Sequence, residues 1–267
     1  MRSDAPHRRH MLGLGLALGL SALSFGGAAQ AQGGAPDKAQ GVTPDKAQGV
    51  TPGKEGAAPA RIGIIGAGNI GGTIGSLWVK GGHAVMFSSR HPEELKGLVE
   101  GLGEGAKAGT PAEAIAFGEA VLIAVPYKAY PDLAKQYAEA LKGRVVIDAG
   151  NATQARDGDL YTEVRTNGIG TTSAKYFPGA RIVRAFNAAN YKIFAKNAGR
   201  PAPRMAIPIA GDDEGALELA KRLISDAGFD PVVVGTLKDA DAFAMGSAGF
   251  GHELSAPDLR AKLGLAP

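Results

Sequence analysis

From residue 61 onward, the chain alternates short, almost continuous apolar runs with stretches in which apolar residues recur every three or four positions. The apolar runs, each of strand length, are at 61–65, 84–87, 120–125, 144–149, 181–186, 205–210 and 231–234, and a further short strand is expected at 107–109. Amphipathic spacing predicts helices at 73–80, 132–141 and 213–227. Strands that are apolar throughout are buried on both faces, which predicts an α/β fold with a mainly parallel sheet covered by helices.

Local signals mark where some of these elements begin and end. Thr110 precedes Pro111 and, three positions on, Glu113, which is the spacing of a capping box with a first-turn proline. A helix is therefore expected to begin after Thr110. Pro126 follows the apolar run at 120–125 and ends it, because proline has no N–H group to give to a central strand.

The first apolar run leads into a glycine-rich turn, in the sequence RIGIIGAGNIGG at 61–72. Gly66 permits a tight turn, Gly68 lets a diphosphate approach the backbone, and Gly71 lets the next helix pack on its strand. Glycine accounts for 40 of 267 residues, so the spacing alone is weak, but a strand precedes this turn and a helix and second strand follow it. The predicted diphosphate-binding turn comprises Gly66, Ala67, Gly68, Asn69, Ile70 and Gly71.

The glycine-rich turn indicates which kind of α/β fold to expect. A glycine turn between a first strand and its helix is typical of a Rossmann-type, doubly wound α/β fold. We expect that fold for a domain at 61–267, with a mainly parallel sheet and a small C-terminal lobe. A glycine-rich turn that binds no nucleotide is the alternative.

The residues after the second apolar run indicate which nucleotide is bound. A site for NAD places a carboxylate there to hold the ribose 2′-OH, whereas a cationic residue accommodates the 2′-phosphate of NADP. This chain has Ser88, Ser89 and Arg90, and no carboxylate before Glu93. The pattern favours NADP, because arginine offers a permanent charge and a planar fork of donors. Alternatively, Arg90 is a solvated loop charge and a serine caps the following helix.

The N-terminal residues have the composition of an export signal. Arg8 and Arg9 precede an apolar stretch at 11–25, and Ala29-Gln30-Ala31 has the small residues that a signal peptidase requires. We predict a signal peptide at 1–31, similar to a twin-arginine signal, and therefore a periplasmic or cell-envelope protein after cleavage near Ala31. The apolar stretch is short for a permanent span, so no stable membrane insertion is expected. An uncleaved anchor and the general secretory route are the alternatives.

A low-complexity segment follows the predicted signal. The octapeptide PDKAQGVT at 36–43 recurs at 44–51, and the segment at 32–60 contains few large apolar residues. Such a composition buries too little apolar surface to offset the entropy of ordering. We therefore predict a disordered linker at 32–60.

Charge and cysteine content exclude several other functions. The formal net charge is +3, and removal of 1–31 with its three arginines and one aspartate leaves +1. A nearly neutral domain offers no argument for binding nucleic acid. The chain has no cysteine, which excludes disulfides, thiolate nucleophiles and cysteine-based metal sites. No set of metal ligands is evident in the sequence.

Several segments together resemble a known family. They are GAGNIGGTIG, FSSRHPEEL, AVLIAVPYKA, VVIDAGN, VRAFNAANY and GDDEGALELAKRLISDAGFDPVVVG, within roughly 61–240. They are similar to the coenzyme F420-dependent NADP oxidoreductases, a family related to the N-terminal domain of pyrroline-5-carboxylate reductase and to the reductase domain of the STEAP metalloreductases. The chain departs from some members in having Ala67 within the turn, and in the shortness of its C-terminal segment.

The resemblance implies a cofactor and positions around it. It implies NADP(H), with the diphosphate at the glycine turn and the 2′-phosphate at the Ser-Arg pair. It places Val125, Pro126 and Tyr127 along the ribose and nicotinamide, and Asn187 to Ala189 beside the carboxamide. It also implies F420 or a flavin as a second cofactor and hydride acceptor.

The sequence designates no catalytic residue, which suits hydride transfer between stacked rings, since that step needs orientation more than a proton donor. Two other functions stay open. One is an imine or keto reductase for a small substrate, with Tyr127, Tyr191 or His252 as proton donor. The other is a non-catalytic dinucleotide sensor. The sequence also leaves open whether the protein forms a homodimer.

Overall fold

The computed structural model describes residues 58–266. The predicted signal peptide and all but the last three residues of the predicted linker lie outside the described residues. Ala60, the last residue of that linker, is 1% exposed, and its carbonyl accepts a hydrogen bond from the Ala84 N–H at 3.0 Å. The packing of the domain therefore includes Ala60.

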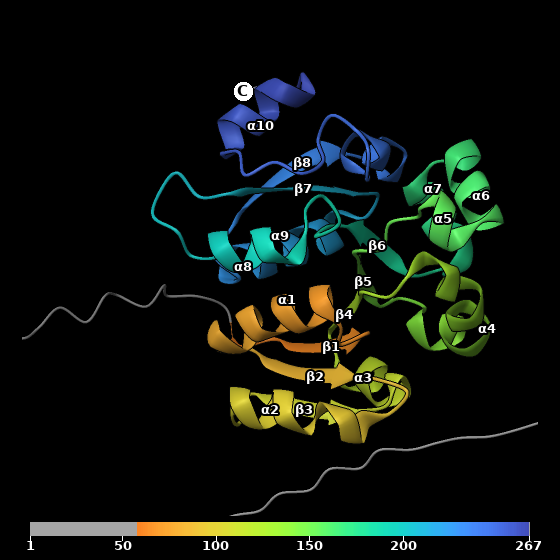
Figure 1. The fold of residues 1–267 in the computed structure, drawn as a ribbon, viewed down its shortest axis with the longest axis vertical. Helices are drawn as coiled ribbons and strands as arrows, with labels where there is room; N and C mark the ends of the chain where they lie inside the picture. Colours follow the sequence, from red (N-terminus) through yellow and green to blue (C-terminus); the bar gives the residue numbers. More distant parts are fainter. Residues whose placement is uncertain (1–57, 267) are drawn as a thin grey trace, which may run out of the picture. The chain divides into compact units, whose positions relative to one another are not determined.

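Residues 58–266 form an eight-stranded sheet in the order β3-β2-β1-β4-β5-β6-β7-β8 (Figure 1). Neighbouring strands are parallel except β6 and β7, which are antiparallel. The predicted Rossmann-type, mainly parallel α/β fold is confirmed. The strands are β1 (Arg61–Ile65), β2 (Ala84–Ser88), β3 (Ala106–Gly109), β4 (Ala120–Ile123), β5 (Val145–Asp148), β6 (Arg181–Arg184), β7 (Ala206–Gly211) and β8 (Asp230–Gly235).

Helices cover both faces of the sheet (Figure 1). They are α1 (Asn69–Lys80), α2 (Lys96–Leu102), α3 (Pro111–Phe117), α4 (Tyr130–Leu141), α5 (Gln154–Asp157), α6 (Asp159–Asn167), α7 (Ile169–Tyr176), α8 (Tyr191–Asn197), α9 (Glu214–Asp226) and α10 (Ala256–Leu263), with 3-10 turns η1 (Pro92–Leu95), η2 (Tyr127–Ala129) and η3 (Leu237–Phe243). Within the described part of the chain, we find no helix that is both long enough and apolar enough to span a bilayer.

The two faces of the sheet bury separate cores. One core packs α1, α8 and α9 on the sheet through aromatic side chains that include Trp78, Phe194 and Phe229. The other packs α4, α7 and η3 on the opposite face, through side chains that include Tyr130 and Phe243. Continuous burial of β4 and β5 between these cores explains why their sequences are apolar throughout.

The helices α5, α6 and α7 are a feature for which the sequence gave no clear periodic signal. Each is short, and glycines with positive φ, Gly158 at 53° and Gly168 at 84°, separate them. α6 contributes Val164 to the core, and α7 packs closely on η3, where a Cβ on Gly170 would lie 2.1 Å from the carbonyl oxygen of Leu237. Because glycines divide this region into short helices, the helical spacing of apolar residues extends over too few positions to be recognised in the sequence.

The fold gathers its loops at one end of the sheet. Because β1, β4, β5 and β6 are parallel neighbours, the turns that follow them meet at the carboxyl edge. The segment after η3 returns to this edge: the N–H of Met245 donates to the Asn151 side chain at 3.2 Å, and the N–H of Gly251 donates to the Ala188 carbonyl at 2.7 Å. This edge is therefore where we expect ligand-binding residues.

Candidate functional site

The three turn glycines have different structural reasons for lacking a side chain. Gly66 has φ +97°, and a Cβ there would lie 2.6 Å from the Val125 side chain. A Cβ on Gly71 would lie 2.1 Å from the carbonyl oxygen of Gly66, which is the close helix-to-strand approach expected for this position. A Cβ on Gly68 would meet no atom within 4 Å. Space next to Gly68 is therefore open to a ligand.

The N-terminus of α1 points its backbone donors at this open space. Gly68 is the N-cap, no side chain caps the helix, and the first turn contains no acidic residue. The first N–H groups of a helix lack intrahelical partners and carry the positive end of the helix dipole. Because α1 has 12 residues and its end is not neutralised by a side chain, this terminus suits an anion such as a diphosphate.

A cavity of about 800 Å³ lies on the β2 side of the glycine turn. We call it the β2-side cavity; it is lined by residues that include Gly66, Ala67, Gly68, Ser88, Ser89, Arg90, Leu95, Val125, Pro126, Lys128 and Tyr137. Arg90 is exposed and makes no hydrogen bond or ion pair with any described residue. Its guanidinium is free to bind an anion in this cavity.

The two serines before Arg90 differ in what they can offer. Ser88 is fully buried, and its hydroxyl donates to the carbonyl oxygen of Ile64 at 2.6 Å. The Ser89 oxygen accepts from the N–H of His91 at 3.1 Å, which leaves its own O–H free to donate. The structure therefore turns the Ser88 hydroxyl away from any ligand, and leaves Ser89 and Arg90 as the side-chain donors of this segment.

A second cavity, of about 630 Å³, lies on the β5 side of the turn. We call it the β5-side cavity; it is lined by Gly68, Asn69, Ile70, Ala124, Val125, Pro126, Ala149, Gly150, Asn151, Arg156, Phe186, Asn187, Ala189, Asn190, Tyr191, Met245 and Phe250. Gly68, Val125 and Pro126 line both cavities. An extended ligand that crosses the turn at Gly68 can therefore occupy both.

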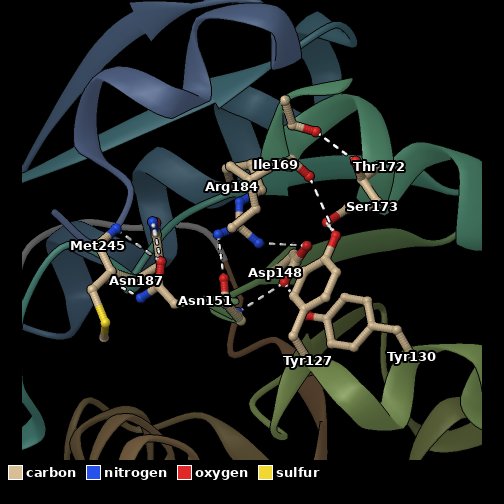
Figure 2. Close-up of polar contacts among 12 residues, drawn as sticks. Tyr127, Tyr130, Asp148, Asn151, Ile169, Thr172, Ser173, Arg184, Asn187 and Met245 are labelled. Carbon is tan, nitrogen blue, oxygen red and sulfur yellow. Dashed lines mark hydrogen bonds and ion pairs between the residues drawn. The ribbon is translucent and has the colours of Figure 1, made fainter. Parts of the chain in front are cut away.

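A buried ion pair lies beneath the β5-side cavity (Figure 2). Asp148 and Arg184 are register partners on β5 and β6, with Oδ2 and Nη1 2.6 Å apart. Asp148 Oδ1 accepts from the Tyr130 hydroxyl and from the Gly150 N–H at 2.9 Å, while Arg184 Nη2 donates to the Gly150 carbonyl. The pair thus fixes the backbone of Gly150, which lines the cavity.

The Asp148 carboxylate has two neighbours, Arg184 and Tyr130, that both stay protonated. Burial acts to lower the pKa of Arg184, but the attraction of Asp148 outweighs it and raises that pKa above its usual value. Burial, followed by the nearby Asp148 charge, raises the pKa of Tyr130 well above its usual value. Arg184 therefore stays charged and Tyr130 keeps the proton that it donates.

Two asparagines connect the loops around the β5-side cavity (Figure 2). The Asn151 amide donates to the Asn187 carbonyl at 2.7 Å, and its oxygen accepts from the N–H of Met245 at 3.2 Å. Phe186, with φ 59°, turns the chain between β6 and Asn187. Asn187 is buried, and its Oδ1 has no hydrogen-bond partner among the described residues. A ligand N–H group, such as that of a carboxamide, would satisfy this acceptor.

The structure places Tyr127 away from both cavities, unlike the position implied by the resemblance. Its ring is fully buried, stacks on Tyr130 with centroids 4.1 Å apart, and its hydroxyl lies 3.1 Å from the Ser173 hydroxyl (Figure 2). Burial, and then the Asp148 charge, raises the pKa of Tyr127 well above its usual value. The 3-10 turn η2 points this side chain into the core, so the Tyr127 hydroxyl faces neither cavity.

The other two proposed proton donors, His252 and Tyr191, differ in whether they line a cavity. His252 lines neither large cavity, and its Nε2 lies 2.9 Å from the Ala248 carbonyl, to which it donates. Tyr191, at the start of α8, lines the β5-side cavity.

Arg156 also lines this cavity. The sequence did not predict this residue, because nothing in the sequence around the short helix α5 points to a ligand. Residues 58–266 bring together no cluster of three or more histidine or acidic side chains that could hold a metal.

The residues that build the glycine turn and the β2-side cavity, and part of those that line the β5-side cavity, match a family model. The model, described as NADP oxidoreductase, coenzyme F420-dependent, covers residues 61–152. This stretch, roughly a third of the chain, is similar to the F420-dependent NADP oxidoreductase family. The predicted resemblance is thereby confirmed, and the match supports an NADP-dependent oxidoreductase.

One relative and two solved structures extend the comparison. The metalloreductase STEAP3 of Rattus norvegicus is 27% identical over 180 residues, 67% of this chain, and the match spans 35% of the rat protein's own length. A hypothetical protein of Sinorhizobium meliloti has a TM-score of 0.63 at 26% identity, over 74% of this chain and 96% of that one. A putative F420-dependent NADP reductase of Arthrobacter sp. FB24 has a TM-score of 0.60 at 22% identity, over 73% and 99%, and shows the shared fold.

The open space at Gly68 leads to a first prediction. Gly68→Val should abolish NADPH binding and preserve the fold, because the added side chain enters the ligand space and its Cβ meets no protein atom within 4 Å. Gly71→Val is the matched contrast, since its Cβ would clash with the Gly66 carbonyl and destabilise the apo-protein. Thermal melts of both variants with and without NADPH measure the two effects. A Gly68→Val protein that still gains stability from NADPH would contradict the diphosphate position.

Proposed function

We propose that this protein transfers hydride between NADP(H) and a flavin or deazaflavin acceptor, such as F420. The family that it resembles consists of NADP-dependent oxidoreductases; the acceptor is our proposal. The observation that carries it is the pair of cavities that meet at Gly68, Val125 and Pro126. One cavity is suited to the phosphorylated end of the nucleotide, and the other has room beyond a nicotinamide for a second ring.

The nucleotide's charged end is assigned to the β2-side cavity. The backbone donors at Gly68 and the start of α1 would hold the diphosphate, supported by the open space at Gly68 and the uncapped helix end. Arg90 and Ser89 would hold the 2′-phosphate, since both have donors that no described residue uses. A charge-assisted contact from arginine to a phosphate is strong and geometrically selective.

The nicotinamide end is assigned to the β5-side cavity. The unpartnered Oδ1 of Asn187 would accept from the carboxamide, and Ala189, Val125 and Pro126 would pack along the ring and ribose. The network that joins Asn151, Asn187 and Met245 holds this wall in place.

Bound NADPH supplies the hydride, and the chain supplies position and an environment poor in acids and bases. Among the residues that line the β5-side cavity in the described part of the chain, only Arg156 and Tyr191 have ionisable side chains. Apolar groups of Ile70, Phe186 and Phe250 provide surface for ring packing. Such a cavity favours hydride transfer between stacked rings, which needs proximity and exclusion of water more than proton transfer.

The proposal also concerns where in the cell the protein is located, on the basis of the N-terminal sequence at 1–31. We propose that 1–31 exports the folded domain, by the twin-arginine route, with its nucleotide already bound, because free NADPH is scarce outside the cytoplasm. Mass spectrometry of the protein from its native source should then find an N-terminus near Gln32 together with retained NADP(H). A native protein that begins at Met1, or that carries no nucleotide, would contradict this proposal.

Arg90 should select the phosphorylated nucleotide. Arg90→Ala should weaken NADPH by about 1.5 to 3 kcal/mol through loss of a charge-assisted contact, and should change NADH affinity far less. Titration calorimetry of both nucleotides measures the difference. Arg165→Ala is a suitable control, since this arginine is exposed on α6 and lines neither cavity. Equal losses of affinity for NADPH and NADH would contradict the assignment of Arg90 to the 2′-phosphate.

The route of the hydride can be followed directly. NADPH deuterated at one C4 face should deliver deuterium to C5 of a deazaflavin, and Tyr191→Phe should lower turnover less than 10-fold, because no side-chain proton transfer limits the step. A loss of about 100-fold or more in Tyr191→Phe, with NADPH affinity unchanged, would instead indicate an imine or keto reductase with Tyr191 as proton donor. Binding of NADPH without turnover on flavin, F420, imine or ketone would indicate a sensor.

A further inference from the structure

Arg156 introduces a positive group into the otherwise uncharged wall of the β5-side cavity. Of the residues that line this cavity in the described part of the chain, Arg156 is the one with a charged side chain. It comes from α5, outside the segments that form the glycine turn and the Arg90 region. Neither nucleotide phosphate position assigned above involves it, because Arg156 is not among the residues that line the β2-side cavity.

The guanidinium of Arg156 is fixed on one side and free on the other. Its Nε lies 3.0 Å from both carboxylate oxygens of Asp157, and its Nη2 lies 2.8 Å from Asp157 Oδ2 and also donates to the Asn151 carbonyl. Its Nη1 has no hydrogen-bond partner among the described residues, and the side chain is 39% exposed. Arg156 therefore presents oriented, unused donors beside the cavity.

Asp157 acts as the anchor of this arrangement. Its side chain is fully buried, and it also accepts from the N–H groups of Thr153 at 2.6 Å and Lys128 at 2.9 Å. Burial acts to raise the pKa of Asp157, but the hydrogen bonds from Arg156, Thr153 and Lys128 outweigh it and hold that pKa below its usual value. With its carboxylate occupied by these donors, Asp157 fixes the orientation of Arg156, and the Nη1 end remains available to a ligand.

We propose that Arg156 is a binding residue for a phosphate group carried by the hydride acceptor. The acceptor would then be a ring compound with a phosphate-bearing side chain, whose ring packs in the β5-side cavity and whose phosphate contacts Nη1. Arginine suits this partner because its planar donors match phosphate oxygens. The inference rests on the proposed function, and it concerns which acceptors the same cavity selects.

FMN and riboflavin form a matched pair of probes, because they share one ring system and differ by a phosphate. Quenching of flavin fluorescence on the full-length protein with saturating NADP⁺ gives both dissociation constants without requiring turnover. We expect FMN to bind about 10-fold or more tightly than riboflavin, as for a charge-assisted contact. Arg156→Gln should reduce this ratio to about one, whereas Arg165→Gln should leave it as in the unaltered protein.

Several outcomes would overturn the proposal. They are equal binding of the two flavins by the unaltered protein, binding of neither flavin, or an FMN preference that survives in Arg156→Gln. A parallel loss of NADP⁺ affinity in Arg156→Gln would place the arginine on the nucleotide instead. Arg156→Lys keeps the charge and should retain part of the preference; its complete loss together with a lower melting temperature would show that Arg156 only supports the loop.

The same titrations separate this inference from the proposed reaction. If FMN is preferred through Arg156 but NADPH reduces no flavin or deazaflavin, the phosphate site stands and the hydride-transfer proposal fails. If NADPH reduces both flavins but binding shows no FMN preference, the reaction stands and the phosphate site fails.

Discussion

The ion pair between Asp148 and Arg184 is the interaction on which the geometry of the site depends. It joins β5 to β6 at their carboxyl ends, where both strands are buried on both faces. Because the pair also hydrogen-bonds the N–H and the carbonyl of Gly150, the loop after β5 is held from two sides. Removing one charge would leave the other uncompensated in the core, which typically costs about 3–5 kcal/mol.

From this pair, a chain of contacts reaches the cavity surface. Gly150 is followed by Asn151, whose side chain joins the loop after β6 to the segment that returns from η3. Arg156 donates to the carbonyl of the same asparagine. Parts of the chain that are distant in sequence therefore form one wall, and a shift of the β5 loop would move the groups assigned to the nicotinamide and to the acceptor together.

The local patterns of the sequence were enough to predict the fold and the family resemblance. The strands were predicted from apolar runs, because full burial on both faces leaves a composition that is easy to recognise. The capping box at Thr110 and Glu113 is present as predicted, since it depends on four consecutive positions. The glycine turn was equally local: Gly66, Gly68 and Gly71 each have the structural surroundings that their spacing implied.

The sequence by itself determined the strands, the longer helices, the glycine turn and the segment with Arg90 after β2, because each of these is encoded within a few neighbouring residues. The tertiary structure alone decided which side chains face a ligand. It turned Tyr127 and the Ser88 hydroxyl inward, placed His252 outside the β5-side cavity, and brought Tyr191 and Arg156 into it. The direction of a side chain depends on how η2, α5 and the C-terminal segment pack, and that packing involves contacts between residues far apart in the chain.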